Sequence, residues 1–65
     1  MNLALLAELN DVEKQLNDVQ TLLDEARSRF PHDQAFQYEC DIQQTEIDYK
    51  RRLVTNAKTY ILSPN

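Results

Sequence analysis

The stretch RSRFPHDQAF, residues 27–36, is the clear interruption in a chain that otherwise follows helical patterns. Pro31 lacks an amide hydrogen and disfavours helical backbone at Phe30, so a first helix is predicted to end near Arg29. Asp33 can cap a second helix that starts directly after it, because its carboxylate accepts hydrogen bonds from the free amides of the first turn. A connection this short makes the two helices antiparallel neighbours. The stretch therefore predicts an αα-hairpin.

The predicted fold is all-α, with one helical-hairpin domain over residues 1–65. It consists of a helix over about 3–29, a corner over 30–33 and a helix over about 34–62. The 65 residues include no Gly, so the corner cannot use the usual glycine cap at the end of the first helix. A domain this small buries little core of its own and usually needs disulfides, a metal, very regular packing or a partner. We therefore expect a partner or dimerisation to complete the hairpin.

The first helix carries an apolar repeat of seven residues. Position a of this repeat holds Leu9, Leu16, Leu23 and Phe30, and position d holds Leu5, Val12, Val19 and Ala26. An unbroken repeat of this kind predicts a long amphipathic helix with a coiled-coil-like seam. The predicted hairpin core combines this seam with apolar residues of the second helix: Leu9, Val12, Leu16, Val19, Leu23, Ile47, Val54 and Ile61.

The second helix carries two apolar stripes, about a third of a turn apart at about 100° per residue. The first stripe holds Phe36, Cys40, Ile47, Val54 and Ile61, and the second holds Ala35, Tyr38, Ile42, Tyr49, Leu53 and Tyr60. One neighbouring helix covers only one stripe, and the sequence leaves open which. An exposed apolar stripe commonly marks an interface. A tyrosine suits an interface because it can bury its ring while its hydroxyl stays in contact with water. The predicted partner-binding residues are Tyr38, Ile42, Tyr49, Leu53 and Tyr60.

Composition narrows the class of partner. Eleven acidic side chains against seven basic ones give a net charge of −4, which argues against nonspecific binding of nucleic acid or of anionic membranes. The apolar run at the N-terminus follows no basic segment and stops at Glu8, so we expect neither a signal peptide nor a membrane span. The lone Cys40 favours a reducing compartment, which predicts a cytoplasmic protein. A helical protein partner and self-association into a four-helix bundle both remain open.

Residues with catalytic or metal-binding chemistry are scarce. His32 lies at the corner without a second His or a nearby Cys, which favours a loop or capping role. Cys40 lies on an apolar stripe and is predicted to be a small buried hydrophobe. The acidic residues of the second helix point to different sides of it, and no glycine-rich phosphate loop or nucleophile–base pair is present in the sequence. We predict no enzymatic activity, no cofactor and no metal.

A basic cluster, Lys50-Arg51-Arg52 with Lys58, gives one alternative. On a dimer of hairpins these residues could form a stripe that binds RNA through its backbone, in which the chain resembles the Rop family of plasmid copy-number regulators. The other interpretation is that they are ordinary solvated residues in the later part of a helix, where positive charge is mildly favourable.

The layout of the chain resembles the small co-chaperones of type III secretion needle subunits. The resemblance lies in an acidic chain of this length, a heptad-rich first helix, a tight corner, and a second helix that opens with DQAFQ, residues 33–37, and closes with TYIL, residues 59–62. It implies a helical hairpin that binds a helical-repeat chaperone and helps to keep the needle subunit monomeric in the cytoplasm. Two rival hairpins are the needle subunit itself and an aspartyl-phosphate phosphatase of sporulating bacteria, whose Ser-Gln-x-Leu-Asp signature is absent from the sequence. A non-enzymatic helical adaptor is thus the predicted function.

Overall fold

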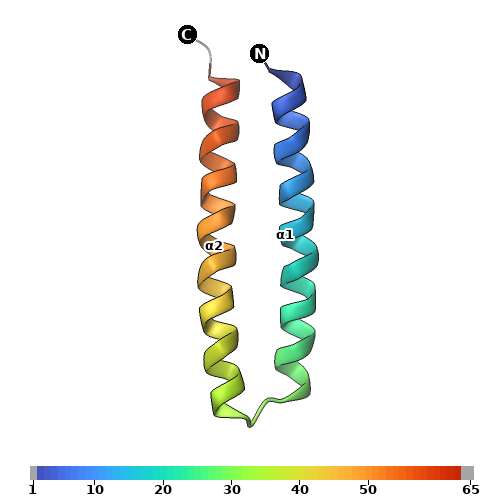
Figure 1. Ribbon diagram of the computed structural model, residues 1–65, viewed down its shortest axis with the longest axis vertical. Coiled ribbons are helices and arrows are strands. Elements are labelled where there is room, and N and C mark those ends of the chain that lie inside the picture. The colour runs from blue at the N-terminus through green and yellow to red at the C-terminus, as the bar shows by residue number, and fades with distance from the viewer. Residues whose placement is uncertain (1, 64–65) are drawn as a thin grey trace.

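The computed structural model describes residues 2–63, which form two helices (Figure 1). Helix α1 spans Leu3–Arg29 and helix α2 spans Gln34–Leu62, and the two run antiparallel on either side of the corner. The free ends of the helices lie together at the other end of the hairpin, which we call the open end. The prediction of an all-α helical hairpin is confirmed, and the helix bounds coincide with the predicted ranges.

Side chains cap the start of both helices. The Asp33 carboxylate accepts a hydrogen bond from the Phe36 amide at 3.0 Å, which is the predicted capping role. The Asn2 side chain accepts one from the Leu5 amide, also at 3.0 Å. Each cap satisfies one of the four amides that the first turn of a helix leaves without a partner.

The end of α1 is capped by a residue of α2. The Gln37 side-chain amide donates hydrogen bonds to the backbone oxygen of Arg27 at 3.2 Å and to that of Phe30 at 2.9 Å. All described residues keep a negative φ, so the chain turns without the left-handed residue that often ends a helix. The ring of Phe30 also meets the ring of Phe36 edge to face, with centroids 5.4 Å apart. Gln37 therefore provides the cap that a glycine often provides at the end of a helix, and its hydrogen bonds connect the two helices at the corner.

Removal of this cap has a measurable consequence. We expect Gln37→Met, which keeps the length of the side chain but loses its donors and acceptor, to lower the free energy of unfolding by about 1–2 kcal/mol. Urea unfolding followed by circular dichroism measures the loss. Gln34→Met is the matched control, because Gln34 is exposed at the first position of the same helix. Equal stability of the two variants would show that the Gln37 contacts do not hold the corner.

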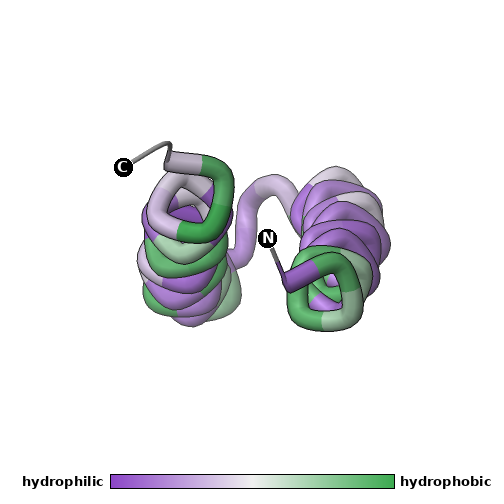
Figure 2. Tube along the Cα trace, turned by 90° about the horizontal axis from the view of Figure 1, so that it is seen from above, coloured by the Kyte–Doolittle hydropathy of each residue, from purple (hydrophilic) through white to green (hydrophobic). Residues whose placement is uncertain are grey.

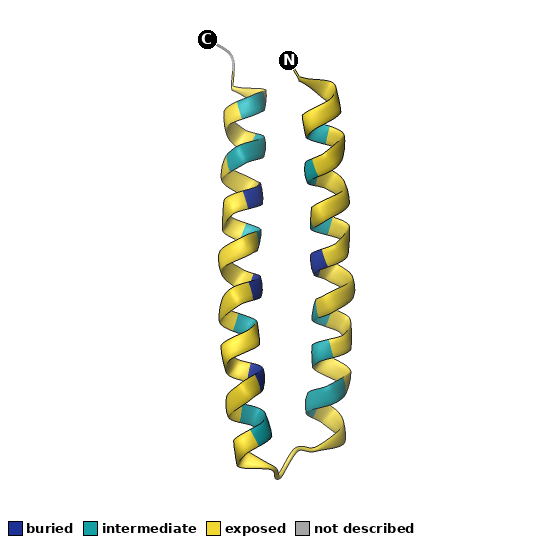
Figure 3. Ribbon diagram, in the orientation of Figure 1, coloured by how far each residue is buried: buried dark blue, intermediate teal, exposed yellow. Residues whose placement is uncertain are grey.

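The buried core is a single narrow line between the helices (Figure 3). Its buried members are Leu16 of α1 and Cys40, Ile47 and Val54 of α2. The predicted core residues Leu9, Leu23 and Ile61 lie half-buried on the same line. The stripe of α2 that faces α1 is therefore the one with Ile47 and Val54, which the sequence left open. Cys40 is 3% exposed and fills this line as a small hydrophobe.

Two predicted core residues lie outside this core. Val12 is 39% exposed and Val19 is 47% exposed, so their placement in the hairpin core is corrected. Two helices bury only the line of side chains that points directly at the neighbour, which here is position a. Position d lies on one flank of that line and position e on the other. Half-buried side chains at position e cover one flank of the contact between the helices. The other flank, with both valines at position d, is exposed to solvent.

The hairpin is long and thin. Its Cα atoms extend over 51 × 16 × 10 Å with a radius of gyration of 15.2 Å, whereas a compact domain of this length has a radius of gyration of about 11 Å. The chain exposes 5243 Å² to solvent. A compact monomer of the same mass, 7.6 kDa, exposes about 4,300 Å². The excess of roughly 900 Å² is close to the ≈ 800 Å² that each partner contributes to a protein–protein interface of standard size.

Candidate partner-binding surface

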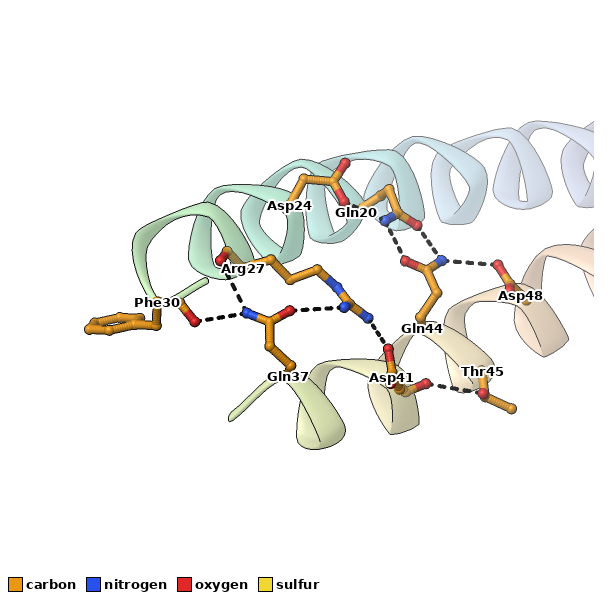
Figure 4. A network of polar contacts seen from close by, with 9 residues as sticks. All are labelled: Gln20, Asp24, Arg27, Phe30, Gln37, Asp41, Gln44, Thr45 and Asp48. Carbon is orange, nitrogen blue, oxygen red and sulfur yellow. Dashed lines mark hydrogen bonds and ion pairs between the residues drawn. The ribbon is translucent and has the colours of Figure 1, made fainter. Parts of the chain in front are cut away.

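One flank of the contact between the helices, which we call the polar edge, is closed by hydrogen bonds. At its centre the side-chain amides of Gln20 and Gln44 donate to each other's oxygens at 2.6 and 2.7 Å (Figure 4). Each amide nitrogen also donates at 3.0 Å to the aspartate four residues further along its own helix, Asp24 for Gln20 and Asp48 for Gln44. Both hydrogens of each amide are used, so this pair fixes the register of α1 against α2.

Towards the corner, the polar edge continues through Arg27. Its guanidinium donates to the Gln37 side-chain oxygen at 3.2 Å and to the Asp41 carboxylate at 2.6 Å. The hydrogen bond to Asp41 raises the pKa of Arg27 above its ordinary value. Asp41 is largely exposed, so water screens the ion pair, and we attribute orientation of Arg27 to it more than stability.

Towards the open end, the polar edge includes two residues of the basic cluster, Arg51 and Lys58. Arg51 donates to the Asn17 side-chain oxygen at 2.8 Å, and the Lys58 ammonium lies 3.2 Å from a Glu13 carboxylate oxygen. A shallow hollow on this edge is lined by Glu13, Asn17, Arg51 and Thr55. Because Arg51 and Lys58 bind α1, only Lys50 and Arg52 of the cluster stay exposed. The four residues do not form one free basic stripe.

The opposite flank of α1 carries what we call the valine line, which consists of Leu5, Val12, Val19 and Ala26. These residues occupy position d, whereas Gln20 and Arg27 of the polar edge occupy position e on the other side of Leu16. Leu5 is 40% exposed, similar to the two valines, and Leu22 beside the line is exposed as well. The valine line is thus an apolar surface that the hairpin itself leaves half-covered.

A second apolar surface lies on α2 and consists of the five predicted partner-binding residues. We call it the tyrosine face: Tyr38, Ile42, Tyr49, Leu53 and Tyr60. All five are exposed, from 39% at Ile42 to 86% at Tyr60. At about 100° per residue they fall within an arc of about 60°, on the side of α2 away from the buried Ile47 line. In the view along the helix axes, hydrophobic segments are accordingly not confined to the sides where the helices face each other (Figure 2).

The remaining candidate residues show no assembled chemistry in the part of the chain that the structure describes. His32 is exposed at the corner. Within residues 2–63, no three His, Cys, Asp or Glu side chains come together as a metal site. Neither described helix contains an apolar stretch long enough to cross a bilayer.

Sequence reasoning missed the polar edge, although a signal for it exists. Polar residues recur every seven positions on both helices: Glu13, Gln20 and Arg27 on α1, and Gln37, Gln44, Arg51 and Lys58 on α2. Two polar repeats of equal period can meet along the whole length of an antiparallel pair. No protein-family model, curated protein or solved structure matches this chain.

Proposed function

We propose that this chain is a non-enzymatic helical adaptor that binds another helical protein through the tyrosine face. The observation that carries the proposal is the exposure of five aligned apolar and aromatic side chains on the outer side of α2. Large apolar surfaces on small proteins commonly mark binding sites. Tyrosine suits such a surface, because it contributes a large ring at low entropic cost and is enriched at interface centres.

The geometry of the tyrosine face supports a helical partner. The face is a straight stripe along a helix, and an amphipathic helix or helical repeat presents apolar side chains with the same rise and period. From Tyr38 to Tyr60 the stripe spans 23 residues, and its two ends lie about 33 Å apart along the helix. A partner helix of six turns matches this length at about 5.4 Å per turn.

Within this function, the class of protein we propose is a cytoplasmic co-chaperone that resembles those of type III secretion needle subunits. In such an assembly the hairpin would bind a helical-repeat chaperone, and the pair would hold an aggregation-prone helical subunit. The proposal rests on the hairpin architecture and on the exposed tyrosine face. It requires no cofactor or catalytic residue.

Co-expression tests this assignment. The tagged full chain is produced with a candidate needle subunit and a candidate helical-repeat chaperone from the same genome. We expect all three to elute together at one size in gel filtration, and the needle subunit to precipitate or polymerise when the hairpin is omitted. If the hairpin elutes apart from both proteins at micromolar concentration, the co-chaperone assignment is wrong.

A further inference from the structure

The valine line is a different surface from the tyrosine face, and it does not depend on the adaptor function. We propose that a second copy of the chain covers the valine line and runs in the opposite direction. The corner of each copy then lies beside the open end of the other, and four helices form one bundle. Three features of the chain support this occupant and this orientation.

The first feature is the separation of charge along the hairpin. Residues 17–48, which make up the corner half, carry eight acidic side chains and two arginines, for a net charge of −6. The described residues of the half with the open end, 2–16 and 49–63, carry three acidic and five basic side chains, for a net charge of +2. Two copies that run in opposite directions place each −6 half against a +2 half. Copies that run in the same direction place −6 against −6, which is repulsive.

The second feature is the symmetry of the valine line about its own midpoint. A two-fold axis across the helices lays α1 on α1 of the second copy in the opposite direction. Val12 then lies opposite Val19 of the second copy, and Leu5 lies opposite its Ala26. Apolar side chains meet apolar side chains along the whole line, as a buried interface requires.

A two-fold axis along the helices would instead lay α1 on α2 of the second copy. The Gln20–Gln44 pair sets the relative height of the helices, so Val19 lies at the level of Thr45 and Val12 at the level of Arg52. On the flank of α2 that would face the valines, the residues nearest to these levels are Gln43 and Lys50, each two positions closer to the corner. The valines would then face an amide and an ammonium group. Charge and register therefore select the same orientation.

The third feature is the amount of surface. The chain exposes roughly 900 Å² more than a compact monomer of its mass, which is enough for one interface of standard size. A second copy supplies an apolar surface of the same length, because the two valine lines are identical.

Light scattering on the purified full chain tests the association itself. We expect a mass of twice 7.6 kDa at high micromolar concentration. A monomer at that concentration overturns the proposal. The adaptor function would be untouched by that result, because it rests on the tyrosine face.

A pair of variants tests the surface. Val12→Glu with Val19→Glu places carboxylates on the valine line, and we expect the dissociation constant of the dimer to rise at least about tenfold. Circular dichroism should still show a helical chain, because both positions are half exposed. The matched control is Ala7→Glu with Thr21→Glu, which adds the same charge at exposed positions on the outer side of α1. A valine variant that stays dimeric, or a control that dissociates equally, would show that another surface is used.

A distance measurement tests the direction. Cys40→Ala removes the native thiol, and His32→Cys then places one spin label on each exposed corner. In the proposed dimer, the two labels lie at opposite ends of the bundle, separated by close to the 51 Å length of the hairpin. A separation of less than half this length would show that the copies run in the same direction and would overturn the proposed orientation.

Discussion

Leu16→Ala is expected to lower the free energy of unfolding of the hairpin by about 2–5 kcal/mol. Leu16 is the one buried residue that α1 contributes among the described residues, and it is 8% exposed. It packs into a core that otherwise consists of Cys40, Ile47 and Val54 of α2. Within the described hairpin, no second apolar layer lies beside this line to collapse into the space that the shorter side chain leaves. A chain of 65 residues has few kcal/mol of stability in total, so the loss removes much of it.

The measurement is thermal unfolding followed by circular dichroism at equal protein concentration. A loss of 2 kcal/mol corresponds to a midpoint lower by at least about 8 °C for a chain of this size. Leu22→Ala is the matched control, because it makes the same chemical change on the same helix at a residue that is 64% exposed. We expect the control to shift the midpoint much less. If the two variants shift it equally, the Leu16 line is not the core of the hairpin.

The corner could be predicted from the sequence because its signals are local. Pro31 ends a helix by its own covalent structure, and Asp33 caps one through an amide three residues away. The cap at the end of α1 could not be read in the same way. Gln37 reaches the backbone oxygens of Arg27 and Phe30 only after the chain has turned. No local sequence signal at the corner indicates this cap. A contact of this kind depends on how the two helices meet.

The core was predicted in part, for a related reason. The heptad repeat places Leu9, Leu16 and Leu23 in the core together with Val12 and Val19, and the burial agrees with the three leucines alone. A repeat of positions a and d describes a helix whose partners cover both positions, however, and α2 covers only one flank of position a. Val12 and Val19 are apolar but stay exposed beside α2, which is the pattern expected where a further surface covers position d. The same pattern that misplaces them in the hairpin core is the signal for the proposed second copy.

The tyrosine face gives the clearest separation of binding from folding. Tyr49→Ala with Leu53→Ala is expected to weaken binding of a helical partner by more than about 2 kcal/mol, or about thirtyfold. Both side chains are about half exposed in the hairpin, at 58% and 49%, so little of the hairpin core depends on them. Alanine is also a better helix former than tyrosine. The thermal midpoint of the isolated chain should therefore stay nearly unchanged.

The contrasting pair is Ile47→Ala with Val54→Ala, on the buried side of the same helix. These residues are 4% and 7% exposed, so their truncation should unfold the isolated chain and abolish binding only as a consequence. Titration calorimetry against the partner obtained by co-expression measures binding, and circular dichroism of each variant alone measures folding. Binding that falls while the helix signal holds identifies the tyrosine face as the site, because lost packing within the hairpin would lower both together. If both pairs unfold the isolated chain to the same extent, the outer side of α2 is part of the core, and the adaptor proposal fails.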